Sequence, residues 1–261
     1  MKKVLLSAAI ALTSVAVMGQ SLVSKKGEPI LPQSLDYAIG FDAVPLFNAL
    51  KFNNGNTISA ASPISEFTFF GKRFDSENSA CRFTLMLSTN TAKETNLTPS
   101  LDAGAPDGGD MVEDVTKFNN FGIMLGFGHE FRRGNTRIQG YWGAEGFAGI
   151  STAKNKFEYG NDRDDLADGD YNVEVREGTN FSLTARGFMG VEYFVAPKFS
   201  IGLEYGIAAS LAFQGQGEAT TFTVEAGDAG SEQTNNVGSK STAFGVNTDV
   251  AGGRVVALFH F

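Results

Sequence analysis

The sequence predicts an all-β fold, an eight-stranded antiparallel up-and-down transmembrane β-barrel with short periplasmic turns and long extracellular loops. Three observations predict it. Apolar and small or polar residues alternate over unusually long segments, short and long connections alternate along the chain, and the chain begins with an export signal. Composition agrees: Gly (31 residues) and Phe (23) are abundant and Pro (7) is scarce, and Pro cannot donate a hydrogen bond within a central strand.

The clearest predicted strand covers Phe199 to Phe213. Its odd positions are all apolar, and its even positions are small residues apart from Glu204. Soluble strands usually have about 5–6 residues, and a tilted strand needs about 9–11 residues to cross a bilayer. This strand exceeds both lengths. We therefore expect its odd face to contact lipid.

The same pattern predicts seven further strands, two of which are less regular. In residues 66–74 the aromatic side chains fall on both faces, so the orientation of this strand stays open. The last strand keeps one apolar face only if a β-bulge lies near Gly252 and Gly253. The seven segments are approximately 37–44, 66–74, 81–88, 120–130, 138–148, 181–194 and 242–261.

The connections between these strands alternate strictly in length. In outer-membrane barrels the periplasmic turns are short and the extracellular loops are long. An even number of strands then places both termini in the periplasm. A soluble secreted β-sandwich, the alternative fold, does not require this alternation. The short connections are 75–78, 133–136 and 196–198, and the long ones are about 46–63, 91–115, 154–178 and 215–240.

The first 19 residues are a predicted signal peptide. Lys2 and Lys3 precede a stretch of apolar and small residues, and we expect cleavage between Gly19 and Gln20. The stretch is shorter than the roughly 20 residues of a transmembrane helix. Residues 20–35 are then a polar periplasmic arm, and residues 36–261 form the barrel domain.

If the apolar faces contact lipid, the opposite faces fill the barrel. Buried charges need opposite charges and hydrogen bonds, so an interior charge network is expected. Side chains can just fill an eight-stranded barrel, and a packed structural interior is the main expectation. A narrow water or ion path and a specific ligand pocket are the alternatives. The predicted network comprises Asp42, Arg82, Glu130, Glu145, Arg186, Glu192, Glu204 and Arg254.

Aromatic residues gather at the strand ends assigned to the periplasmic side, and such rings favour the bilayer interface. The two histidines, His129 and His260, lie at the same end beside apolar residues. We expect them to be interfacial side chains, not general bases, and we expect no catalytic residues and no enzymatic activity. The predicted aromatic residues are Tyr37, Phe131, Tyr141, Trp142, Tyr193, Phe194, Phe259 and Phe261.

The sequence gives little reason to expect a cofactor or a metal. It has a single Cys, no His/Cys cluster suited to a transition metal and no nucleotide-binding motif. A formal charge of −8 argues against nucleic acid. One acidic segment is a weak Ca²⁺ candidate, but its spacing is not that of an EF-hand, and a solvated surface loop is favoured. Its carboxylates are Asp162, Asp164, Asp165, Asp168 and Asp170.

The end of the chain carries a family resemblance. Residues 255–261 alternate apolar and aromatic side chains, and with Gly253, Phe259 and Phe261 they resemble the signal that the barrel-assembly machinery recognises in bacterial outer-membrane barrels. Segments 37–45, 70–74 and 80–82 resemble small barrels of the OmpA/OmpX type in Bacteroidota, described as an outer membrane protein beta-barrel domain or porin family. The resemblance covers residues 37–261.

This resemblance implies an outer-membrane protein that contacts lipid and lipopolysaccharide and meets the barrel-assembly machinery during biogenesis. The sequence leaves the oligomeric state open, and a monomer is the preferred expectation. The implied role is structural, supporting envelope integrity and presenting surface loops. A small-solute or ion channel is the alternative, and a loop-mediated adhesin or a subunit of an envelope complex is a further one. Because the sequence ends on its last predicted strand, the cell-wall anchoring of full-length OmpA is not expected.

Overall fold

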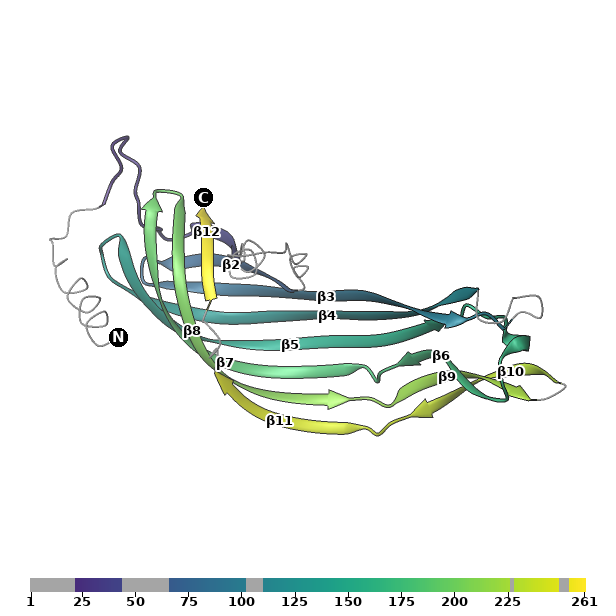
Figure 1. Ribbon diagram of the computed structural model, residues 1–261. Coiled ribbons are helices and arrows are strands. Elements are labelled where there is room, and N and C mark those ends of the chain that lie inside the picture. The colour runs from purple at the N-terminus through teal and green to yellow at the C-terminus, as the bar shows by residue number, and fades with distance from the viewer. Residues whose placement is uncertain (1–21, 44–65, 102–109, 226–227, 249–253) are drawn as a thin grey trace, which may run out of the picture.

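The computed structural model describes residues 22–43, 66–101, 110–225, 228–248 and 254–261 (Figure 1). These residues form a single antiparallel sheet of twelve strands and one short 3₁₀ helix, so the predicted all-β antiparallel class is confirmed. No helix among them is long and apolar enough to cross a membrane. The predicted signal peptide (1–19), the cleavage site at Gly19 and Gln20, and Gly253 lie outside the described residues.

Strand pairing closes on itself to form a ring. Each ring strand pairs with the next, and the last pairs with the first, with Phe259 opposite Ile39. The order is β1 (Tyr37–Asp42), β2 (Glu66–Ser76), β3 (Ser79–Pro99), β4 (Met111–Arg133), β5 (Ile138–Glu158), β7 (Asn180–Ala196), β8 (Phe199–Gln214) and β12 (Arg254–His260).

The sheet continues beyond the ring as an extension, which comprises residues 90–99, 111–120 and 153–158 of β3, β4 and β5 together with three further strands. These are β6 (Gly169–Arg176), β9 (Gly217–Glu225) and β10 (Asp228–Val237), and the order across the extension is β10-β9-β6-β5-β4-β3. In Figure 1 the extension projects to the right, away from the end that carries the C-terminus.

The extension corrects the prediction of loops at 91–115, 154–178 and 215–240, because much of each range is strand. The polar composition of these segments indicated loops. An antiparallel ladder, however, satisfies the main-chain N–H and C=O groups whatever the side chains are. The Thr residues that recur there, such as Thr91 and Thr95, also suit strands.

The last part of the chain pairs with β8 in two pieces. In β11 (Ser241–Thr248), Thr248 pairs with Ile207, whereas Arg254 of β12 pairs with Glu204. Thr248 and Arg254 are six residues apart, whereas their partners on β8 are three residues apart. Because these two spacings differ by an odd number of residues, the positions that face outward change between β11 and β12. Such a change was the reason for expecting a bulge near Gly252 and Gly253, which lie outside the described residues.

The outer face of the ring carries large exposed apolar side chains on every strand, and these, together with those of β11, are named here the outer apolar belt. From Ile201 to Phe213, twelve steps of ~3.3 Å make ~40 Å, or ~30 Å of height at a ~40° tilt. Members of the belt include Ile39, Phe41, Phe67, Phe69, Phe83, Phe121, Leu125, Phe127, Ile150, Phe181, Leu183, Met189, Val191, Ile201, Leu203, Tyr205, Ile207, Phe213, Phe244, Val246 and Phe259.

The faces of β2 are also resolved. Phe67 and Phe69 belong to the belt, whereas Phe70 and Phe74 are buried inside the ring. They form a small apolar core with side chains of the neighbouring strands, namely Ala38, Ala80, Val256 and Leu258.

The N-terminal arm lies at the end of the ring that carries the short turns. Leu35 N donates to Phe74 O at 2.8 Å, and Phe74 N donates to Asp36 O at 2.9 Å. Ile30 is buried, and Pro29 and Pro32 share a hollow with the turn residues Glu77 and Asn78 and with residues 133–135. The arm thus packs against the ring through apolar as well as polar groups.

Candidate functional site

A continuous network of ion pairs fills the interior of the ring near the short turns. Its first part surrounds two acids. Lys72 Nζ lies 2.9 Å from Glu130 Oε2 and 3.3 Å from Glu192 Oε2. Arg132 Nη1 donates to both carboxylates, at 2.9 Å to Glu192 Oε2. Within this part, Glu130 and Glu192 thus face the same two basic side chains.

The second part is centred on Arg82. Its Nη1 donates to Glu204 Oε2 at 2.6 Å and to Glu130 Oε2 at 3.2 Å, which joins the two parts. Its Nε lies 2.6 Å from Glu145 Oε1 as an ion pair without hydrogen-bond alignment. Arg186 Nη1 donates to Glu204 Oε1 at 2.7 Å. One guanidinium therefore contacts three carboxylates.

The network is buried and balanced in charge. Each of its eight members is at most 5% exposed. Four basic residues face four acids, so no member lacks an opposite charge. Such pairing is what makes burial tolerable, because an unpaired ion in a low-dielectric interior costs several kcal/mol. The members are Lys72, Arg82, Arg132 and Arg186 with Glu130, Glu145, Glu192 and Glu204.

Aromatic rings and glycines complete the packing. The Arg82 guanidinium carbon lies 4.1 Å from the centre of the Phe188 ring. A Cβ at Gly206 would lie 2.5 Å from Arg186 Nε, and one at Gly190 would lie 2.3 Å from the ring of Tyr141. Inward-facing glycines therefore leave the room that large side chains of neighbouring strands occupy.

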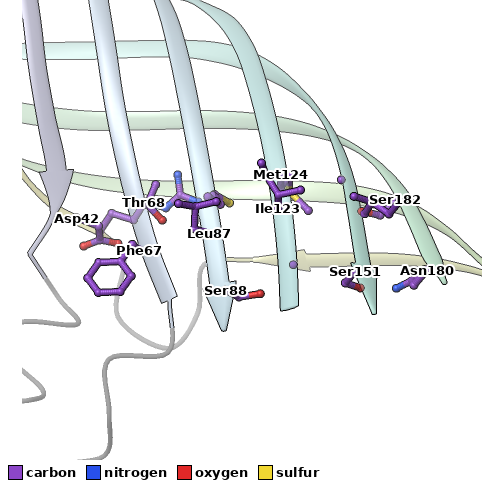
Figure 2. Close-up of a pocket in the computed structure, with 15 residues that line it drawn as sticks. Asp42, Phe67, Thr68, Leu87, Ser88, Ile123, Met124, Ser151, Asn180 and Ser182 are labelled. Atoms are coloured by element: carbon purple, nitrogen blue, oxygen red, sulfur yellow. The ribbon is translucent and has the colours of Figure 1, made fainter. Parts of the chain in front are cut away.

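A cavity of about 410 Å³ lies beyond the network, on the side toward the extension (Figure 2). Its lining is rich in small polar side chains, and Arg254 reaches both this lining and the network, where its Nη1 lies 4.0 Å from Glu204 Oε1. The interior thus has a hollow region and a filled one. Polar residues of the lining are Asp42, Thr68, Ser88, Ser151, Asn180 and Ser182.

The structure places the eight predicted interior residues as follows. Six of them are network members, Arg254 lies at the network's edge, and Asp42 lines the cavity. Lys72 and Arg132 were not predicted from the sequence. Lys72 lies on the strand whose faces did not separate. Arg132 follows Glu130 by two positions, so period-2 alternation could have found it had the strand been extended past residue 130.

His260 corrects the expectation of an interfacial histidine. It is 5% exposed, with Nε2 2.8 Å from Ser200 Oγ and 3.4 Å from Glu192 Oε1. Its ring also packs near Phe74 and Phe194. Because side chains alternate along β12, exposed Phe259 requires its neighbour His260 to face inward.

Two of the aromatic residues predicted to lie at the periplasmic bilayer interface lie inside the ring. Phe194 follows the outward-facing Tyr193, and Tyr141 precedes the outward-facing Trp142. Because side chains alternate between the two faces of a strand, Phe194 and Tyr141 are buried inside the ring. Tyr193 and Trp142 are exposed as expected. So are Tyr37, Phe131, Phe259 and Phe261, among which Tyr37 and Phe261 stack with ring centres 6.1 Å apart.

The acidic segment packs against the extension. It contains the 3₁₀ helix η1 (Arg163–Asp165), and Arg163 pairs with Glu232 of β10. Asp170 Oδ1 accepts a hydrogen bond from Thr223 Oγ1 at 2.7 Å. The described carboxylates of the segment, those of Asp162, Asp165, Asp168 and Asp170, do not converge as a set of metal ligands.

No family model and no curated protein matches this chain. Among solved structures, the outer membrane protein OprG from Pseudomonas aeruginosa is similar over 89% of this chain and 98% of OprG, with 9% sequence identity and a TM-score of 0.31.

Proposed function

We propose that this chain is an integral outer-membrane protein, an eight-stranded β-barrel of the OmpA/OmpX-like type with a mainly structural role in the envelope. The outer apolar belt carries this proposal. Soluble monomers rarely expose a contiguous apolar patch larger than a few hundred Å², whereas the belt includes every ring strand. Its height of ~30 Å on β8 is close to the ~25 Å apolar band of outer-membrane barrels.

Lipid and lipopolysaccharide surround the belt, and both termini lie in the periplasm. Phe259 and Phe261, with Gly253, serve as the signal for the barrel-assembly machinery. The barrel acts as a monomer and has no enzymatic activity.

The interior favours a structural barrel over an open channel. The network fills the ring with paired side chains that water barely reaches, and conduction would require several ion pairs to separate at once. The cavity can hold water or a small solute, but the network lies between it and the short turns.

We expect the protein to be electrically silent in planar lipid bilayers. A variant with Arg132→Ser and Glu192→Ser removes two large side chains from the network while keeping its charge balanced, and it should conduct ions in small steps. Folding of both proteins is checked by the mobility shift of unheated samples on gels. Steady conductance by the unaltered protein would contradict the structural role and favour the channel alternative.

The extension supports a second candidate role, presentation of a rigid surface to a partner outside the cell. The outer half of β3 pairs only with β4 among the described residues, and β10 pairs only with β9. Both edges therefore offer main-chain groups that another strand could pair with. An adhesin or a subunit of an envelope complex would use such a surface.

The orientation can be tested with epitope tags on intact cells. A tag inserted after Gly238, between β10 and β11, should bind antibody without permeabilisation. A tag after Lys26 of the N-terminal arm should bind only after permeabilisation. The opposite labelling pattern would contradict the proposed orientation and the surface role together.

A further inference from the structure

Three metal-ligating side chains lie together outside the interior network. Asp75, Cys81 and His129 each offer one ligand atom, and these atoms all lie within 4.8 Å of one another. Within the part of the chain that the structure describes, no other group of three or more such side chains occurs. The cluster spans β2, β3 and β4 near the short turns, on the outward-facing side of the sheet.

Strand register brings these residues together. Cys81 pairs directly with His129 across β3 and β4, and with Arg73 across β3 and β2. Asp75 lies two positions after Arg73, where the register of β2 shifts before the turn. Cys81 Sγ donates to Asp75 Oδ2 at 3.2 Å, and His129 Nε2 lies 3.7 Å from the same oxygen.

These separations suit a single tetrahedral metal ion. Zinc binds sulfur at about 2.3 Å, imidazole nitrogen at about 2.0–2.1 Å and carboxylate oxygen at about 2.0–2.2 Å. Tetrahedral angles then place neighbouring ligand atoms roughly 3.3–3.6 Å apart. The separations of 3.2 and 3.7 Å from Asp75 Oδ2 lie close to this range. The Cys81 sulfur and the His129 ligand nitrogen lie within 4.8 Å of each other, so a side-chain movement that brings these two atoms closer lets all three bind one ion.

Neighbouring side chains already orient two of the three ligands. Arg73 Nη2 donates to Asp75 Oδ1 at 2.8 Å, which directs Oδ2 toward Cys81 and His129. The Phe131 ring packs against the imidazole of His129 with ring centres 4.8 Å apart. Contacts of this kind around a metal site fix ligand geometry and raise affinity.

We propose that Asp75 Oδ2, Cys81 Sγ and His129 Nε2 bind one divalent transition-metal ion of the zinc class. Binding releases the thiol proton to solvent, so that a thiolate and a carboxylate balance the two positive charges of the ion. Water occupies the fourth position. A thiolate and an imidazole with one carboxylate favour zinc over calcium or magnesium, which prefer oxygen ligands.

No transition-metal site was expected from the sequence, because no His/Cys cluster occurs along the chain and the three ligands stand apart at positions 75, 81 and 129. Only the register of three strands makes them neighbours.

Cobalt(II) added to the detergent-solubilised full chain tests the proposal. The chain has one Cys, so a sulfur-to-cobalt charge-transfer band can only come from Cys81. We expect this band at one ion per chain and its loss on adding one equivalent of zinc. His129→Ala and Asp75→Asn should weaken zinc binding more than about tenfold in calorimetry, the least effect expected even of residues around a site. Asp168→Asn, in the acidic segment, should not.

Alkylation of Cys81 gives a second measurement. Zinc at a concentration that just saturates the unaltered chain should markedly slow the reaction of Cys81 with a maleimide, and it should slow this reaction much less in His129→Ala. The gel mobility of unheated samples shows that each variant is folded. The absence of a cobalt–sulfur band, or zinc affinity that is the same in His129→Ala, would overturn the proposal without bearing on the membrane role.

Discussion

Glu192→Gln is expected to lower the free energy of unfolding by about 3–5 kcal/mol, the usual cost of removing one partner from a buried ion pair. Glu192 is fully buried, faces Lys72 and Arg132, and lies near His260. Without its charge, the two basic side chains share Glu130 alone. One positive charge of this group is then buried without a matching carboxylate.

Urea unfolding in lipid vesicles can measure this loss. The chain has a single Trp, and Trp142 lies on the outer face of the ring, where its fluorescence reports contact with lipid. The midpoint of Glu192→Gln should fall well below that of the unaltered chain. The double variant Glu192→Gln with Arg132→Gln should recover part of the loss, because it removes the charge left unpaired.

Glu158→Gln is the matched control. Glu158 accepts hydrogen bonds from Lys117 and Lys156 on the extension, and these bonds lower its pKa. All three side chains are substantially exposed, so solvent screens the pair and the unfolding midpoint should stay the same. Equal effects of Glu192→Gln and Glu158→Gln would show that the interior network does not hold the ring together.

The side of the ring on which a residue lies was predictable wherever alternation was regular. Glu204 and Arg186 face inward because apolar residues occupy the alternate positions of β8 and β7. On β2, Phe residues at both odd and even positions removed this signal. The interior turns out to accept aromatic rings as well as charges, with Phe70 and Phe74 packed beside Arg82 and Arg132.

Other features depended on distances between strands, which no pattern along one strand contains. The convergence of Arg82 on three carboxylates needs the register of β3 against β4 and the width of the ring. The extension needed backbone pairing between segments whose side chains are polar. The apolar neighbours of His260 in the sequence suggested the bilayer interface, whereas its position in the alternation of β12 places it inside the ring.

Ile207→Arg is expected to weaken stable insertion into lipid vesicles. Ile207 lies midway between Ile201 and Phe213 on the exposed face of β8, within the outer apolar belt. An Arg on the lipid face near the bilayer midplane costs about 2–4 kcal/mol. That is a large part of the stability of a small domain, commonly ~5–15 kcal/mol. The folded fraction, measured by gel mobility of unheated samples after refolding into vesicles, should fall sharply.

Thr95→Arg provides the comparison, because Thr95 is exposed on the extension, outside the belt. It should refold into vesicles as well as the unaltered chain. A soluble β-sandwich would behave in the opposite way, since Arg at an exposed position would improve solubility without detergent and leave folding intact. The two substitutions introduce the same charge on two exposed strand positions. A difference between them therefore reports the surroundings of the belt, and equal behaviour in both would contradict a lipid-facing ring.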